Sequence, residues 1–502
     1  MVTPNTIVKL YSGIPCDPTY QNVLQWDSVT EQNQFFANKV PVATYTDFQF
    51  IDGTRELRIK RQMENCYHIN YVAYQNHRYG NKWFYAFVSD MRYLSPESTA
   101  LILDEDVWAS WQFDLTFNKS FVERETVSND AIGAHTVPEN LELGPYETTD
   151  VKSIVFHYNT YYVYATNPLD DTWDSSFPMG GEYSGGSFNP VLANVPIYNK
   201  KYAISGWNTL LNDLAQFAEQ GKADAVLAVT LQCSNASVTE SFPAIKTNYS
   251  ARNNKLFTFP YVSGVAYAPG QVLELRYEQW ANREYQLFTD GGPNKRFVFM
   301  PVNYAGELHN QAYQITVPAT MPLPWISNYF QNWSAQNRAQ NIVGVVGGVL
   351  DIAGGAITAA GGKEGAGASG IIGGAMKIAN VIAAKYQASI MPDIMHGSFE
   401  NGSMAILNGL ISINLICRSI RPEYAKIIDD YFSMYGYKVA RVKEIELHSR
   451  SNWNFVKTIG CNVIGECPST VIDSVKNMFD NGVTLWHNGT FNYGNLDNPI
   501  TS

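Results

Sequence analysis

The hydrophobic and polar positions between residues 54 and 127 predict six elements in succession. Alternating positions predict strands over 54–62, 82–94, 96–105 and 119–127. Helices are predicted over 63–76 and over 106–115, where Val107, Trp111 and Leu115 share one face. The order is therefore β-α-β-β-α-β, which is the ferredoxin-like or split β-α-β arrangement.

A second stretch, from residue 405 to the end of the chain, repeats this order. Strands are predicted over 405–419, 437–445, 452–465 and 483–487. Helices are predicted over 421–436, with Pro422 in the first turn and Gly436 as the stop, and over 468–482. Two similar modules in one chain suggest a ring in which each copy supplies two wedges, and two unrelated α+β sandwiches are the alternative.

The intervening sequence is rich in turn residues and predicts short strands. One helix interrupts them over residues 206–221, where apolar residues recur at helical spacing and are expected to face a core. These residues are Trp207, Leu210, Leu211, Leu214 and Phe217. We therefore predict an α+β fold, mostly β, with two ferredoxin-like modules, a β-rich insertion and a long Gly/Ala-rich hydrophobic loop.

The predicted elements divide the chain into four segments. They are an N-terminal module (1–127), a β-rich insertion (128–320), a helix followed by a hydrophobic loop (321–400, the loop over about 339–391) and a C-terminal module (401–502). A length of 502 residues is compatible with several cores, since one domain rarely exceeds a few hundred residues.

The loop segment has the most unusual composition in the chain. Residues 347–376 are dominated by glycine and alanine, and Asp351, Lys363, Glu364 and Lys377 interrupt the surrounding apolar sequence. A single transmembrane helix needs about 20 mostly apolar residues, and these charges leave only shorter runs. The spacing G-x-G-x-x-G occurs over 365–370, but no strand precedes it and no suitably placed acid follows it, so a nucleotide site is not expected.

A hairpin-like excursion with two apolar arms, 341–360 and 369–384, fits this segment better. Small residues recur four apart, which allows close backbone approach in a membrane. Leaving the apolar side chains of both arms in water would cost on the order of 20 kcal/mol. We expect the arms to be hidden at rest and to act on a membrane later. A buried core hairpin and a flexible linker are the alternatives.

The candidate membrane-active residues are the large apolar side chains of the two arms. They are Ile342, Val343, Val345, Val346, Val349, Leu350, Ile352, Ile357, Ile371, Ile372, Met376, Ile378, Val381 and Ile382.

Composition and motifs argue against catalysis and against tight nucleic-acid binding. The net charge of −11 disfavours binding to a phosphate backbone. No HExxH, GxSxG or P-loop motif occurs, and the eight histidines are dispersed. The acidic run 104–106 opens a helix, and Asp429 and Asp430 are assigned to a solvent face. We expect no enzyme activity, no cofactor and no metal. The N-terminus does not resemble a signal peptide, so synthesis in a cytoplasm is expected.

Several aromatic clusters carry a family resemblance. They are "YGNKWFYAFV" (79–88), "LDEDVWASWQFDLTFNKSFVERE" (103–125), "KLFTFPYV" (255–262), "YGYKVARVK" (435–443), "WNFVKT" (453–458) and "FDNGVTLWHN" (479–488). In this order they resemble the tail-knob (distal tail tube) proteins of small short-tailed phages of Gram-positive bacteria. No clear match is seen over residues 128–250.

This resemblance implies a virion protein at the distal end of the tail. It implies a homohexameric tube whose lumen passes the genomic DNA without specific binding. It also implies hydrophobic loops that plug the lumen and then form a pore in the host cytoplasmic membrane. The implied partners are other tail proteins, namely the upper tail tube or lower collar and the tip protein. From the residues alone, a free-standing pore-forming protein and a tail-tip cell-wall hydrolase stay open.

Overall fold

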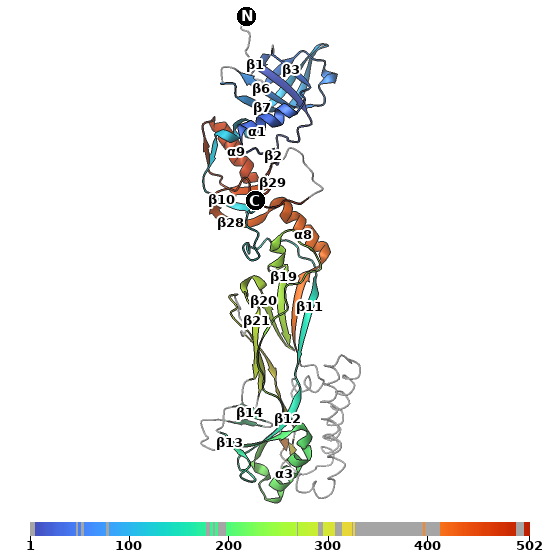
Figure 1. Ribbon diagram of the computed structural model, residues 1–502, viewed down its shortest axis with the longest axis vertical. Helices are drawn as coiled ribbons and strands as arrows, with labels where there is room; N and C mark the ends of the chain where they lie inside the picture. The colour runs from blue at the N-terminus through green and yellow to red at the C-terminus, as the bar shows by residue number, and fades with distance from the viewer. Residues whose placement is uncertain are drawn as a thin grey trace. The chain divides into compact units, whose positions relative to one another are not determined.

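The chain folds into two compact units, each assembled from separate stretches of sequence (Figure 1). The computed structural model describes residues 6–46, 49–51, 55–76, 80–176, 181–183, 186–188, 197–268, 270–289, 295–306, 314–323, 325–326, 395–396, 412–487 and 496–501. Unit 1 comprises Met1–Pro145, Tyr249–Tyr261 and Ile420–Ser502, and unit 2 comprises Tyr146–Asn248 and Val262–Ser419. The four segments expected from the sequence do not coincide with these units, because the chain passes between the units several times.

Unit 1 begins with a seven-stranded sheet of order β3-β1-β6-β7-β8-β5-β4. Its strands are β1 (Thr6–Ser12), β3 (Ala43–Tyr45), β4 (Gln49–Ile51), β5 (Glu56–Ile59), β6 (Ile69–Asn76), β7 (Trp83–Ser95) and β8 (Ser98–Glu105). Helix α1 (Val29–Asn38) starts at Ser28, whose hydroxyl accepts a hydrogen bond from the Glu31 amide at 3.2 Å. Phe36 of α1 packs on the aromatic face of the sheet.

The helix predicted over 63–76 is wrong, because this stretch forms a short 3-10 turn followed by strand β6. Tyr71 and Ala73 face one apolar cluster, whereas Val72 belongs to another on the opposite face. A strand buried on both faces shows no clear alternation, so its pattern resembles that of a helix.

A second sheet in unit 1 combines strands from both ends of the chain, in the order β2-β31-β29-β10-β28. They are β2 (Asn22–Leu24), β10 (Ser120–Glu125), β28 (Tyr437–Lys443), β29 (Trp453–Ile459) and β31 (Val483–Trp486). Helix α9 (Ser469–Asn481) contributes Val475 and Phe479 to the core on one face, together with Trp108 of α2 (Val107–Trp111). Strands β9 (Leu115–Phe117) and β30 (Val463–Gly465) pair beside it.

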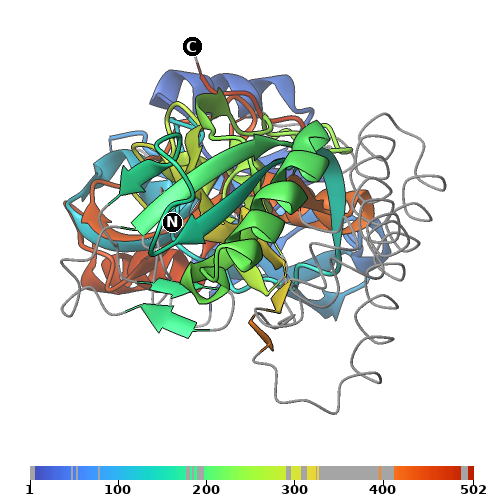
Figure 2. The same cartoon turned by 90° about the horizontal axis from the view of Figure 1, so that it is seen from below.

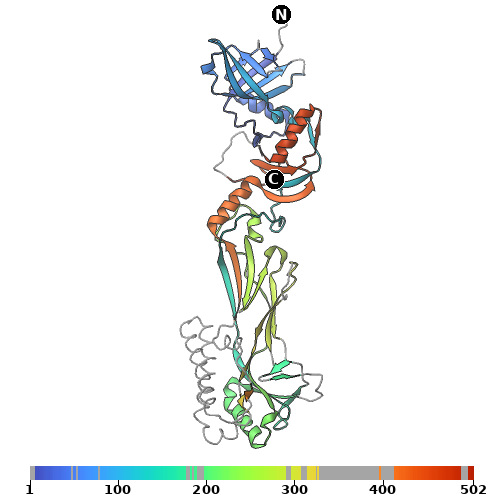
Figure 3. The same ribbon diagram turned by 180° about the vertical axis from the view of Figure 1, so that it is seen from behind.

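The C-terminal elements α8 (Pro422–Tyr435), β28, β29, α9 and β31 follow the predicted order (Figure 3). The prediction of two separate ferredoxin-like modules is wrong. Strand β27 (Ser412–Ile420) belongs to a sheet of unit 2, and β10 from the N-terminal half is inserted between β28 and β29. Periodicity predicts an element but does not identify its partners, which lie hundreds of residues away.

Unit 2 is built from antiparallel sheets. One sheet has the order β13 (Asp174–Ser176), β16 (Ile197–Ala203), β12 (Tyr158–Ala165), β17 (Val226–Cys233) and β24 (Thr320–Leu323). Helix α3 (Trp207–Glu219) packs on β12 and β16 (Figure 2). Its predicted core stripe is confirmed, since Trp207, Leu210, Leu214 and Phe217 are buried and Leu211 packs against them.

Two further sheets complete the core of unit 2. One has the order β11 (Tyr146–Val155), β27, β19 (Val262–Ala268) and β20 (Gln271–Leu275). The other has the order β18 (Ser237–Ser241), β21 (Glu284–Thr289), β22 (Arg296–Pro301) and β23 (Ile315–Pro318). Short pairs form between β14 (Gly181–Tyr183) and β15 (Gly186–Phe188), and between β25 (Trp325–Ile326) and β26 (Met395–His396). The predicted α+β fold, mostly β, is confirmed at this level.

Candidate functional site

The structure describes the two strands that flank the glycine-rich segment but not the segment itself. The fourteen candidate membrane-active residues between Ile342 and Ile382, and the charges Asp351, Lys363, Glu364 and Lys377, lie outside the described residues. Their role stays a prediction. Strands β25 and β26, which flank residues 327–394, pair in antiparallel register, with Trp325 opposite His396 and Ile326 opposite Met395. We call this pair the neck. It brings the start and the end of the segment together.

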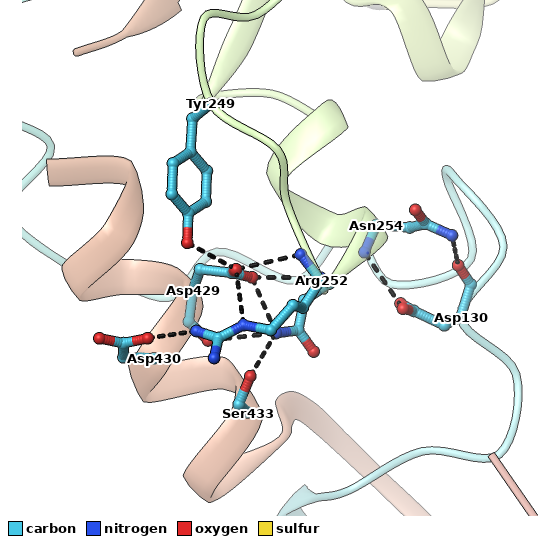
Figure 4. A network of polar contacts seen from close by, with 8 residues as sticks. Asp130, Tyr249, Arg252, Asn254, Asp429, Asp430 and Ser433 are labelled. Atoms are coloured by element: carbon cyan, nitrogen blue, oxygen red, sulfur yellow. Dashed lines mark hydrogen bonds and ion pairs between the residues drawn. The ribbon is translucent and has the colours of Figure 1, made fainter. Parts of the chain in front are cut away.

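A network of polar contacts in unit 1 surrounds the carboxylate of Asp429 on helix α8 (Figure 4). The Asp429 side chain is fully buried. Its Oδ2 accepts hydrogen bonds from the Tyr249 hydroxyl at 3.0 Å, the Arg252 amide at 3.0 Å and the Arg252 Nε at 3.2 Å. Its Oδ1 accepts from the Asn253 amide at 3.1 Å and from the Asn253 Nδ2 at 2.8 Å. We call these contacts the joint.

Helix geometry places the joint residues on one face of α8. Asp429 and Ser433 are four positions apart and both buried, and the Asn253 Nδ2 also donates to the Ser433 Oγ at 2.8 Å. The guanidinium of Arg252 additionally pairs with Asp430, which is partly exposed. Burial, followed by the charge of Asp429, raises the pKa of Tyr249 to about 12. Donors from Tyr249, Arg252 and Asn253 therefore converge on the Asp429 carboxylate, and the arrangement holds residues 249–253 on the helix.

The same stretch is bound a second time, by residues 128–139. The Asn254 amide donates to the Asp130 Oδ2 at 3.1 Å, as Figure 4 shows. Lys255 is almost fully buried, pairs with the buried carboxylate of Glu139 and donates to the Val137 carbonyl at 3.0 Å. Burial lowers the pKa of the Lys255 ammonium. Residues 249–261 thus belong to unit 1 through charged contacts, although their neighbours in sequence on both sides belong to unit 2.

A second buried carboxylate lies in the N-terminal part of unit 1. Asp106 caps helix α2, and its Oδ1 accepts a hydrogen bond from the Ala109 amide at 3.0 Å. Its Oδ2 accepts from the Tyr71 hydroxyl at 2.8 Å. Burial raises the pKa of Asp106 to about 6. The prediction that the acidic run 104–106 opens a helix is confirmed for Asp106 alone, because Asp104 and Glu105 end strand β8.

Two histidines that are far apart in sequence form a stacked pair. The rings of His448 and His487 lie 4.1 Å apart with an interplanar angle of 4°. The Nδ1 of His448 is 2.9 Å from the Asp27 Oδ1, and the Nε2 of His487 is 3.1 Å from the Asn454 Oδ1. Burial and then the neighbouring His448 lower the pKa of His487 to about 4. Because the two histidines are far apart in the sequence, this pairing could not be predicted from it.

The assignment of Asp429 to a solvent face is wrong, and the joint is the main feature that sequence reasoning missed. On α8 a charged residue, Asp429, is buried, whereas an apolar residue, Ile427, is 66% exposed. The usual rule that apolar side chains are buried and charged ones exposed therefore fails for both residues. No pattern within α8 indicates that Arg252 and Asn253, far away in the sequence, supply the donors. The motif over 255–262 was the available signal, since it immediately follows the anchored residues.

Neither a metal site nor a membrane-spanning helix is found among the described residues. They contain no group of three or more His, Cys, Asp or Glu side chains arranged to hold a metal ion. In the part of the chain that the structure covers, no helix has both the length and the apolarity required to cross a bilayer.

Comparisons with known proteins agree along the chain. Residues 228–499 match the family described as the C-terminal domain of tail knob protein gp9 of Bacillus phage phi29. Residues 4–116 match the family described as the N-terminus of the caudoviral major tail protein.

Similar full-length proteins carry the same description. The chain is 22% identical to tail knob protein gp9 of Bacillus phage B103, over 99% of this chain and 98% of that protein. It is 23% identical to tail knob protein gp9 of Bacillus phage phi29, over 98% and 97%. These alignments also run through residues 128–250, where the sequence alone gave no clear match.

A solved structure shows a similar fold. Tail knob protein gp12 of bacteriophage C1 has a TM-score of 0.62 and 15% sequence identity, with 99% of this chain and 100% of that chain covered. At this identity, the likeness concerns the fold alone.

Proposed function

Because this chain belongs to the phi29 gp9 family of tail knob proteins, a structural role in the phage tail tip follows, and we propose a more specific one. Six copies enclose a channel through which the genome leaves the virion. Residues 339–391 of each copy plug that channel at rest and enter the host cytoplasmic membrane during delivery. The protein acts as a structural part without catalysis, alongside other tail proteins.

The neck is the observation that carries this proposal. Since β25 and β26 pair, the two ends of residues 327–394 are held next to each other. The whole apolar stretch lies between these two strands. An insertion closed at its base can exchange one environment for another while the sheets around it keep their pairing. Once the arms have left the channel, the unfavourable hydration of their fourteen large apolar side chains, on the order of 20 kcal/mol, drives them into lipid rather than water.

An exposed apolar row supports assembly from several copies. Val442 of β28 and Ile459 of β29 both lie opposite Phe121 of β10, so all three side chains share one face of the sheet. Their exposed fractions are 65%, 59% and 37%. Contiguous apolar side chains of this kind are typical of contact surfaces. In a closed ring, each copy presents two different surfaces to its neighbours.

The charge of the chain fits a conduit for DNA. A net charge of −11 disfavours tight binding of a phosphate backbone, which would hold DNA in place. Asp351 and Glu364 oppose entry of the loop into lipid while they are ionised. Acidification would protonate them and lower that barrier, which makes low pH the first trigger to test, ahead of DNA pressure or loss of a tip protein.

A deletion tests the membrane role. Residues 341–385 are replaced by a short Gly-Ser linker, and the protein is mixed with liposomes that contain a self-quenched dye. We expect the variant to fold and assemble like the parent chain and to release no dye above background. A matched control keeps the segment length and replaces the fourteen apolar side chains by serine, and it should be equally inactive. Unchanged leakage from the deletion variant contradicts the membrane role.

Fractionation by size separates this proposal from a free-standing pore. Dye release by the assembled fraction supports the proposed role. Release by the monomer fraction alone would favour a pore-forming protein that acts outside a virion. Incubation with peptidoglycan should release no product, whereas product release would indicate a cell-wall hydrolase.

A further inference from the structure

A pocket in unit 1 lies between helix α1 and the aromatic face of the seven-stranded sheet. Its floor is the methyl group of Ala73, which lies between Lys9 on β1 and Tyr85 on β7 in the strand register. Both cross-strand neighbours of Ala73 are large, so the small side chain leaves a gap between them. Asn33 and Ala37 of α1 border this gap on the opposite side. The hollow measures about 380 Å³ including the space open to solvent.

The aromatic rings around the pocket leave one ring system available. Phe36 stacks on Tyr85, with ring centroids 4.6 Å apart and an interplanar angle of 25°. Tyr11 packs against the same phenylalanine at 5.5 Å. These rings therefore already contact one another. The half-buried indole of Trp83 lines the pocket beside them.

The polar groups at the mouth are donors without a protein acceptor. The Nζ of Lys9 lies 5.1 Å from the centroid of the Trp83 ring. Among the described residues, no carboxylate lies within ion-pair distance of Lys9, and the side chain of Asn33 has no hydrogen-bond partner. No Asp or Glu lines the pocket. A ligand would therefore meet one positive charge, one carboxamide and one indole.

We propose that this pocket binds a single sugar ring that carries a negative charge. The apolar C–H face of a pyranose can lie on the Trp83 indole, its hydroxyls can pair with the Asn33 amide, and its anionic group can pair with Lys9. Because the 380 Å³ includes space open to solvent, the enclosed part of the hollow is smaller than a typical small-molecule site of roughly 300–1,000 Å³. It therefore suits no more than one ring, which stays partly in solvent. A nucleobase is less suited, because Tyr85 and Phe36 already stack on each other and leave no second open face.

Binding is tested on the full chain with defined small molecules. Calorimetric titration compares glucuronate, glucose, inorganic phosphate and a short oligothymidylate. We expect saturable binding of glucuronate with a dissociation constant of about 1 mM, the range expected for so small a ligand. Glucose should bind at least fivefold more weakly, and phosphate should not saturate. Absence of saturable glucuronate binding, or tighter binding of the oligothymidylate, overturns the proposal.

Variants locate the site. Ala37→Trp, on the exposed side of α1, should block the mouth and reduce glucuronate binding at least tenfold. Gln34→Trp, at an exposed position of the same helix that does not line the pocket, is the matched control and should bind normally. Lys9→Met should weaken glucuronate binding about fivefold and leave glucose binding unchanged. If Ala37→Trp binds glucuronate as well as the parent chain does, the ligand is elsewhere and this pocket is not its site.

Discussion

Two stretches of the chain are joined to the described fold in different ways. Residues 249–261 pass from unit 2 into unit 1 and are fixed there by the joint at Asp429 and by Asp130 and Glu139. Residues 327–394 begin and end at the neck, where two residues of each strand pair. The first stretch is anchored by charged, directional contacts. The second is distinguished by its apolar composition.

The difference lies in how each kind of interaction responds to new surroundings. Charged hydrogen bonds depend on particular donors at particular distances, so the first stretch has one favourable position. Hydrophobic burial is non-directional and scales with the area removed from water, so apolar arms are satisfied equally well by protein or by lipid. Under the proposed function, the sheets of the tube keep their pairing while the loop is released, so the chain is expected to use both kinds of interaction.

The largest effect on stability should come from breaking the joint. Asp429→Asn places an amide against the donors of Tyr249 and Asn253 and removes the buried partner of Arg252. We expect the free energy of unfolding of unit 1 to fall by about 3 kcal/mol, because the buried donors of Asn253 lose their charged acceptor. Arg252 is partly exposed and keeps Asp430 as a partner. Chemical denaturation followed by tryptophan fluorescence measures this change.

Asp430→Asn is the matched control for that variant. Its side chain is 34% exposed and pairs with the same Arg252. Exposed pairs contribute at most about 1 kcal/mol, so a small loss is expected. Equal losses in the two variants would contradict the view that burial of Asp429 makes the joint strong.

A comparable effect on stability should follow pH at the other buried carboxylate. The pKa of Asp106 is raised to about 6 by burial, above its ordinary value of 3.8, so the folded state holds this proton more tightly than the unfolded state does. The stabilisation is complete below about pH 4 and is lost as pH rises through 6. It amounts to roughly 3 kcal/mol.

The variant Asp106→Asn isolates this contribution. Its amide oxygen can still cap α2, and its amide group can donate to Tyr71. The unfolding free energy of the parent minus that of the variant should decrease between pH 4 and pH 7. Taking this difference cancels the contribution of other titrating groups such as His487. A difference that is flat across this range would show that the buried carboxylate does not titrate there.

The smallest effect on stability is expected within the second stretch. The double variant Asp351→Asn, Glu364→Gln should change the unfolding free energy of the assembled chain by less than about 0.5 kcal/mol, because both substitutions leave the described cores of the two units unchanged. Dye release from liposomes at neutral pH should nevertheless increase, because two charges no longer oppose entry into lipid. Unchanged dye release at neutral pH would contradict the proposal that these carboxylates oppose entry into lipid.

The sequence predicted elements better than their partners. Helices α8 and α9 were predicted from the proline near the start and the glycine at the end of each, which are local signals. The neighbours of β10 were not predictable, because a strand that ends at Glu125 pairs with strands beginning at Tyr437 and Trp453. Pairing over such distances depends on the whole fold rather than on any local period.

The polar sites were hidden for the same reason. Asp429 appears as a surface acid in the helix sequence, and its burial follows from donors that come from residues 249–253. The pocket over Ala73 depends on three strands and one helix, and a lone alanine in a strand gives no sign of a cavity. The hydrophobic loop was conspicuous because its composition alone is unusual.

The mass of the purified full-length chain in solution tests the central claim most directly. Six chains of 56.1 kDa would give an assembly of about 337 kDa. The account predicts this mass, with a central channel visible in electron micrographs of the same particles. A strict monomer of 56.1 kDa at high protein concentration would contradict a channel built from several copies of this chain.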